Sequence, residues 1–124
     1  MGRDTLKHVL SQQLQLLERD FAGLLRSSPT WNDLQARSLD IISLTLHRLS
    51  STVETLPSHQ ALSVDMRHEL RNQLTVIMGY AQLMQHRRAG ELPIEASVCL
   101  QKIMAIVTHI NTSLDQDKQQ ARNS

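Results

Sequence analysis

The chain has 124 residues, of which 40% are apolar, 20% charged and only 2% aromatic, and its formal net charge is +1. This length suits a single domain, and the small net charge gives no electrostatic reason to expect binding to nucleic acid or to an anionic membrane surface. The single cysteine, Cys99, excludes an internal disulfide, and no apolar run is long enough for a membrane span or a secretory signal, so we expect a cytoplasmic protein.

Apolar residues in the first half of the chain recur at spacings of three and four, which predicts two helices. The first helix should end near Pro29, because proline breaks the helical hydrogen-bond pattern, and Pro57 should end the second. Either Ser28 or Thr30 is expected to cap the second helix. The apolar stripes consist of Leu10, Leu14, Leu17, Phe21 and Leu24, and of Leu39, Ile42, Leu46, Leu49, Val53 and Leu56.

The second half of the chain repeats this pattern. A third helix should begin between Gln60 and Val64, with Ser63 as a candidate cap, and Gly90 should provide a left-handed helix end before Pro93 opens the fourth helix. The polar residues after Leu114 are expected to fray. The stripes here are Leu70, Leu74, Ile77, Ala81 and Met84, and Ala96, Leu100, Ile103, Val107, Ile110 and Leu114.

These four stripes predict an all-α protein made of two helical hairpins, residues 4–56 and 61–115, that form a four-helix bundle. We divide the chain into an N-terminal hairpin at 1–57, a second hairpin at 58–117 and a polar tail at 118–124. A lone hairpin cannot bury both of its stripes well. Either the two hairpins close on each other within one chain or each hairpin meets its copy in a dimer, and periodicity does not decide between these arrangements.

His68 lies outside the apolar stripe of the third helix. At about 100° per residue, it lies on the outer flank of the helix, with Asn72 one turn further along the same face. Glu69 follows His68 directly and can reach an imidazole nitrogen in a suitable rotamer. An isolated histidine in such a place is usually no more than a solvated surface residue, so its meaning depends on the residues around it.

The residues around His68 resemble a known sequence motif. The sequence His-Glu-Leu-Arg-Asn-x-Leu-Thr-x-Ile-x-Gly-Tyr, residues 68–80, resembles the phosphoacceptor box of sensor histidine kinases, which belongs to their dimerisation and histidine phosphotransfer domain. The match is dense over 67–83, and the resemblance extends over roughly 61–114, under half of the chain. The family often has proline where this chain has Gln73, so we expect a straighter helix here. The N-terminal hairpin resembles no family that we can name.

The resemblance implies roles for three residues in phosphoryl transfer. His68 would be the phosphorylated residue, Glu69 would hold the imidazole tautomer and take its proton, and Asn72 would position water when the partner is dephosphorylated. Arg71 matches a basic family position near the phosphoryl group, although an exposed helical arginine needs no such role. No cofactor is implied for this hairpin, and the other histidines have no metal-ligand spacing with each other or with Cys99.

The resemblance also implies a partner surface. The partner would be the receiver domain of a response regulator, which would lay a helix against the face below His68. A separate histidine kinase is a further candidate partner, and the family habit is to form homodimers through the third and fourth helices. The expected partner-binding residues are Arg71, Thr75, Met78, Gly79 and Gln82.

Three functional hypotheses remain open at this point. The chain is a phosphotransfer module in which His68 exchanges phosphate with a receiver aspartate, a non-phosphorylated helical protein that binds a kinase or regulator, or a fragment of a full sensor kinase. The four glycines are scattered and form no phosphate-binding loop. We therefore expect phosphotransferase-like chemistry and no autonomous ATP-dependent kinase activity.

Overall fold

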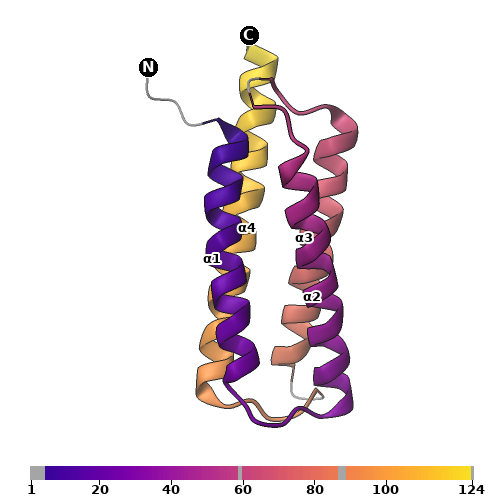
Figure 1. Ribbon diagram of the computed structural model, residues 1–124, viewed down its shortest axis with the longest axis vertical. Coiled ribbons are helices and arrows are strands. Elements are labelled where there is room, and N and C mark those ends of the chain that lie inside the picture. The colour runs from indigo at the N-terminus through magenta and orange to yellow at the C-terminus, as the bar shows by residue number, and fades with distance from the viewer. Residues whose placement is uncertain (1–4, 59, 87–88, 124) are drawn as a thin grey trace.

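A computed structural model describes residues 5–58, 60–86 and 89–123, which form four α-helices and, within those ranges, no β-strand (Figure 1). The prediction of an all-helical protein is therefore confirmed. The helices are α1 (Leu6–Arg26), α2 (Asp33–Glu54), α3 (Val64–Gln85) and α4 (Ile94–Asn123).

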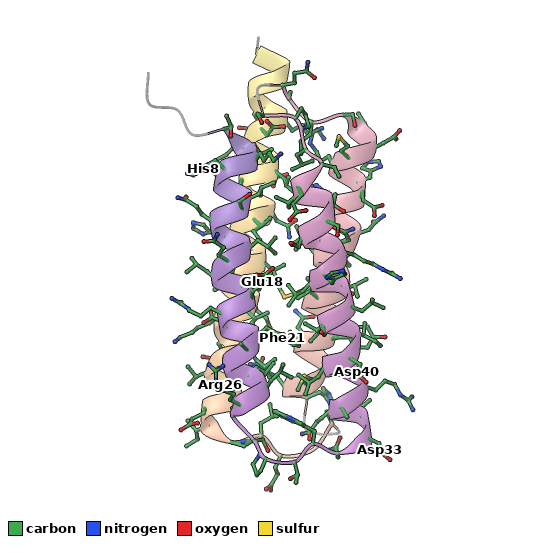
Figure 2. All side chains as sticks on the ribbon, in the orientation of Figure 1. His8, Glu18, Phe21, Arg26, Asp33 and Asp40 are labelled. Carbon is green, nitrogen blue, oxygen red and sulfur yellow. The ribbon has the colours of Figure 1, made fainter. Side chains whose placement is uncertain are left out.

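The helices form an antiparallel bundle in which α1 packs mainly against α4 and α2 mainly against α3 (Figure 1). Further contacts between α1 and α2 and between α3 and α4 complete the ring. The start of α1, the α2–α3 connection and the end of α4 lie at one end of the bundle. The other two connections lie at the opposite end. Charged side chains such as Arg26 and Asp40 point outward, whereas Phe21 belongs to the core (Figure 2).

The core of the bundle closes within one chain. Leu70, Leu74 and Ile77 of α3 and Leu100 and Ile103 of α4 are all 0% exposed, and the predicted stripes of α1 and α2 are buried with them in one cluster. Of the two arrangements that periodicity left open, the structure therefore has the one in which the two hairpins pack on each other. No second copy of the chain is needed to bury these stripes.

The helix starts were predicted with mixed success. Ser63 caps α3 as expected, because its side chain accepts a hydrogen bond from the Met66 amide. The expectation that Ser28 or Thr30 caps α2 is wrong. Asn32 is the cap, and it forms a reciprocal capping box with Gln35. Asn32 also contacts a residue far away in the sequence, because its Nδ2 donates a hydrogen bond to the Ala89 carbonyl at 2.6 Å.

The end of α4 also differs from expectation. The helix continues to Asn123, so the prediction that the chain frays after Leu114 is wrong. Within this polar extension of the helix, Asp117 pairs with Arg67 of α3 across the end of the bundle, at 3.2 Å. Gly90 has a positive φ of 111°, as expected for glycine, but it lies in the α3–α4 connection and does not directly follow the end of α3 at His86.

None of the four helices, over the residues that the structure describes, combines the length and apolar character needed to cross a membrane. From the sequence we expect His59 to be a surface or partly buried residue and Arg87 and Arg88 to cap a helix end. These three residues lie outside the described residues.

Candidate functional site on the outer face of α3

His68 lies in the second turn of α3, near the bundle end that holds the α2–α3 connection. Its side chain is exposed, and it makes no hydrogen bond or ion pair with any residue that the structure describes. The helix is set in this position by its buried stripe, in which Leu70 and Leu74 are 0% exposed. Because these residues face the core, His68 faces solvent on nearly the opposite side of the helix.

Of the residues expected on this face, four are exposed and two, Arg71 and Met78, are half-buried. Asn72, Thr75, Gly79 and Gln82 are all exposed, whereas Met78 is half-buried and packs against the core. Their spacing from His68 follows the helical repeat, so they form one row along α3. We refer to His68, Asn72, Thr75, Gly79 and Gln82 as the outer row. It is polar near His68 and carries no side chain at Gly79.

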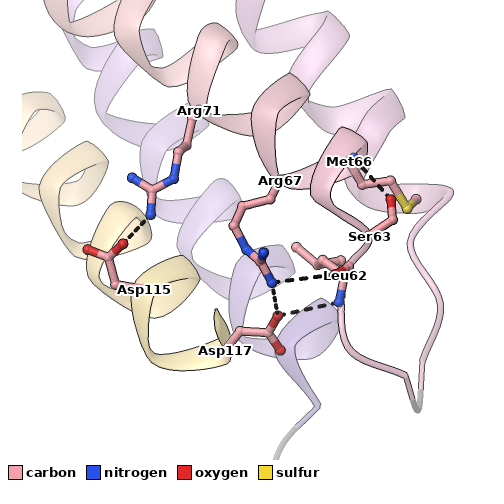
Figure 3. Close-up of polar contacts among 7 residues, drawn as sticks. All are labelled: Leu62, Ser63, Met66, Arg67, Arg71, Asp115 and Asp117. Carbon is pink, nitrogen blue, oxygen red and sulfur yellow. Dashed lines mark hydrogen bonds and ion pairs between the residues drawn. The ribbon is translucent and has the colours of Figure 1, made fainter. Parts of the chain in front are cut away.

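Two arginines flank the outer row on the α4 side (Figure 3). Arg67 is 8% exposed, and its Nη2 donates to Asp117 Oδ2 at 3.2 Å and to the Leu62 carbonyl at 3.4 Å. Arg71, one turn on, pairs with Asp115, and this pair is far more exposed. Arg71, predicted to lie near a phosphoryl group, is therefore engaged by a carboxylate of its own chain.

A glutamine network flanks the outer row on the α2 side. Gln73 Nε2 donates to Glu69 Oε1 and to Thr52 Oγ1 of α2, each at 3.0 Å. Glu69 is therefore bonded to Gln73, and no hydrogen bond joins it to His68 within the described residues. The helix runs without interruption through Gln73.

Gly79 is the least expected residue in the outer row. Glycine inside a helix costs about 1 kcal/mol relative to alanine, and close packing against a neighbouring helix such as α4 is one reason to tolerate it. The structure excludes that reason, because a Cβ built at Gly79 meets nothing within 4 Å. At Gly23, by contrast, the built Cβ lies 3.3 Å from Cys99 Sγ of α4. Gly79 thus leaves an open notch on the helix surface that internal packing does not require.

The sequence pattern located the outer row but not the residues that hold its neighbours. In the sequence, Arg67 stands at the edge of the box, Gln73 stands where the family often has proline, and Asp115 and Asp117 are among the polar residues after Leu114 that were expected to fray. Each of these residues has its partner on another helix. The one available signal was the polar character of Arg67 and Gln73 beside the apolar stripe, which requires a partner when such side chains are buried.

Comparison with protein-family models, with characterised proteins and with solved structures finds no match for this chain. The resemblance of residues 67–83 therefore depends on those residues alone. Within the part of the chain that the structure describes, no group of three or more His, Cys, Asp or Glu side chains is placed to hold a metal ion.

Proposed function

We propose that this chain is a two-component signalling module in which His68 accepts a phosphoryl group and exchanges it with the aspartate of a response-regulator receiver domain. The observation that carries the proposal is the placement of His68. It is exposed and makes no bond to a described residue of its own chain, while Leu70, Leu74 and Ile77 of the surrounding box are buried. A reactive histidine must be accessible in this way to meet a partner domain.

The chemistry requires little of the bundle itself. A ring nitrogen of neutral His68 attacks the phosphorus of the receiver's aspartyl phosphate, so that an N–P bond forms as the acyl O–P bond breaks. The receiver carboxylate leaves with the bonding pair, and the other ring nitrogen of His68 releases its proton. Glu69, once turned toward the ring, is the nearest acceptor in the sequence for that proton. The reverse sequence returns the phosphoryl group to the aspartate.

The outer row is the docking surface in this proposal. A receiver helix would lie along Thr75 and Gly79, where the surface is open, and would bring the receiver aspartate to His68. Asn72, exposed one turn from His68, would orient water for hydrolysis of the receiver's acyl phosphate. A homodimer through α3 and α4 also belongs to this proposal. It would use the outer faces of those helices, because their buried stripes are occupied within the chain.

A second candidate function is supported by a different observation. Glu69 is bonded to Gln73 and Arg71 is paired with Asp115, so two residues expected to serve the phosphoryl group are engaged within the chain. This arrangement favours a helical protein that binds a histidine kinase or a response regulator without being phosphorylated. In a third reading, the chain is a fragment of a full sensor kinase.

Phosphoryl transfer from a radiolabelled, phosphorylated receiver domain to the purified chain tests the proposal. We expect acid-labile label on the wild type and none on His68→Gln. His109→Gln is the matched control, because His109 is also exposed on a helix surface, on α4. Both substitutions should change the free energy of unfolding by no more than about 0.5 kcal/mol, as is usual at exposed sites.

The two remaining outcomes have distinct meanings. Label that survives on His68→Gln would place the phosphoryl group on another residue and refute the assignment of His68. A receiver that binds the wild type but never labels it would refute the transfer proposal and favour the interaction protein.

A further inference from the structure

Gln73 connects α2 with the carboxylate that follows His68 in the sequence. The residue is 8% exposed, and its Nε2 donates one hydrogen bond to Thr52 Oγ1 and one to Glu69 Oε1, each at 3.0 Å. One buried amide group therefore contacts both a neighbouring helix and a residue of the candidate site.

The orientation of this amide is fixed from the α2 side. The Thr52 hydroxyl donates its own hydrogen to the Arg48 carbonyl at 2.9 Å, so its oxygen acts as the acceptor toward Gln73. Because Glu69 also presents an acceptor, the amide nitrogen must face both groups, and the opposite assignment would place the amide oxygen against a carboxylate. The Gln73 Oε1 atom is left buried without a hydrogen-bond partner in the described structure.

Glu69 itself is held by little else. The residue is exposed, and its bond to Gln73 is the only hydrogen bond or ion pair that it makes with a described residue. That bond directs the carboxylate toward α2. Adjacent residues of a helix project about 100° apart, and while Glu69 Oε1 is bonded to Gln73 no hydrogen bond joins the Glu69 carboxylate to the His68 imidazole in the described structure.

We propose that Gln73 is a positioning residue that holds the Glu69 carboxylate on the α2 side of α3 and away from His68. The consequence for phosphoryl transfer depends on the proposed function: while Glu69 is bonded to Gln73, it does not accept the imidazole proton, and transfer is slowed. Since Thr52 anchors the amide, movement of α2 against α3 changes the position of Glu69. Through this contact, the N-terminal hairpin influences the candidate site.

The position of Glu69 is tested by NMR without any phosphorylation. In protein labelled with ¹⁵N at histidine, the ring shifts of His68 report its tautomer and its contacts. The measurement is the change in these shifts caused by Glu69→Gln, first in the wild type and then in Gln73→Leu. We expect no change in the wild type and a clear change in Gln73→Leu, because the released carboxylate then reaches the ring.

Two further variants locate the effect. Gln85→Leu makes the same replacement at a half-buried position at the end of α3, and it should behave like the wild type. Thr52→Val removes the acceptor on α2 while keeping the shape of the side chain, and it should give a smaller change of the same sign as Gln73→Leu. A wild-type result for Thr52→Val would refute the anchoring of Gln73 on α2.

The NMR result can also overturn the positioning proposal as a whole. If Glu69→Gln shifts the His68 signals equally in the wild type and in Gln73→Leu, Glu69 already reaches the ring and Gln73 does not restrain it. If Glu69→Gln has no effect in Gln73→Leu, the released carboxylate does not reach His68. Circular dichroism of each variant shows that the helices are retained.

A phosphoryl-transfer assay with a phosphorylated receiver domain distinguishes a failure of the Gln73 proposal from a failure of the proposed function. We expect Gln73→Leu to raise the transfer rate roughly two- to tenfold, the population change for one hydrogen bond of ordinary strength, and Glu69→Gln to remove that gain. An NMR effect with no label on any variant keeps the positioning role and refutes the proposed function. Label on the wild type with an unchanged rate in Gln73→Leu refutes control of transfer by Gln73.

Discussion

Gly23, Gly79 and Gly90 differ in what an added methyl group would meet. A Cβ at Gly79 would meet open space, whereas one at Gly90 would lie 2.5 Å from Asn32 Nδ2, on a backbone with a φ of 111° that disfavours other residues. The cost of glycine at position 79 is therefore not offset by close packing against any residue that the structure describes. A close approach by a partner helix is the remaining physical reason for it that the outer row suggests.

This contrast gives a prediction of opposite sign at the two glycines. Gly79→Ala should raise the free energy of unfolding by about 0.5–1 kcal/mol, because alanine favours the helix and lowers the conformational entropy of the unfolded chain. Gly90→Ala should lower it, because both the φ angle and the contact with Asn32 oppose a side chain. Urea denaturation of the two variants measures both effects, and a loss of stability in Gly79→Ala would show that the notch is filled in solution.

The two ion pairs between α3 and α4 should differ in energy although they lie one turn apart. The side chains of Arg67 and Asp117 are 10% and 13% exposed, and those of Arg71 and Asp115 are 34% and 61% exposed. Removing one member of a buried pair leaves the other charge without compensation, which makes Asp117→Ala destabilising by roughly 3 kcal/mol.

Asp115→Ala is the matched control for that substitution, with an expected change within about 1 kcal/mol because solvent screens the exposed pair. Thermal or urea unfolding of both variants makes the comparison. Equal losses of stability would mean that the difference in burial does not change the contribution of the two ion pairs to stability.

At the scale of the helix, the proposed docking face of α3 makes a prediction about binding. Thr75→Arg and Gly79→Gln each add bulk to the outer row and should weaken binding to a receiver that binds the wild type. Gln12→Arg adds the same arginine side chain to the exposed surface of α1 and should leave binding unchanged. Titration calorimetry with each folded variant provides the affinities.

Two results of that titration would change the picture. Equal affinities for Thr75→Arg and the wild type would remove the outer row from the interface. Weakening by Gln12→Arg alone would make the N-terminal hairpin the recognition element.

Apolar periodicity predicted the four helices because their stripes are continuous and their ends are marked by Pro29, Pro57 and Pro93. The features that it missed depend on distant partners. Asn32 caps α2 while bonding to Ala89, and Asp117 in the polar end of α4 pairs with Arg67 of α3. Likewise, the side-chain position of Glu69 depends on Gln73 and, through it, on Thr52 of α2. A local pattern contains no information about such contacts until the bundle has closed.

At the scale of the whole molecule, the N-terminal hairpin completes the bundle. Helix α1 packs mainly on α4 and α2 mainly on α3, so the described parts of the N-terminal hairpin and of the second hairpin are two halves of one folded unit. This arrangement gives α1 and α2 a structural role. The resemblance covers only the second hairpin and therefore did not predict that role. It also places the α2–α3 connection close to His68, at the same end of the bundle.

Closure within one chain predicts that unfolding is independent of protein concentration. The midpoint of thermal unfolding should stay constant over a roughly hundredfold range of concentration, because assembly does not contribute to the stability of the core. A swapped dimer, in which the N-terminal hairpin packs on the second hairpin of its partner, would instead raise the midpoint with concentration, with the α2–α3 connection acting as the hinge. Sedimentation at the same concentrations distinguishes a further case. A dimeric mass with a constant midpoint would indicate association through outer faces, as the resemblance implies, whereas a 14.1 kDa species throughout would refute homodimerisation.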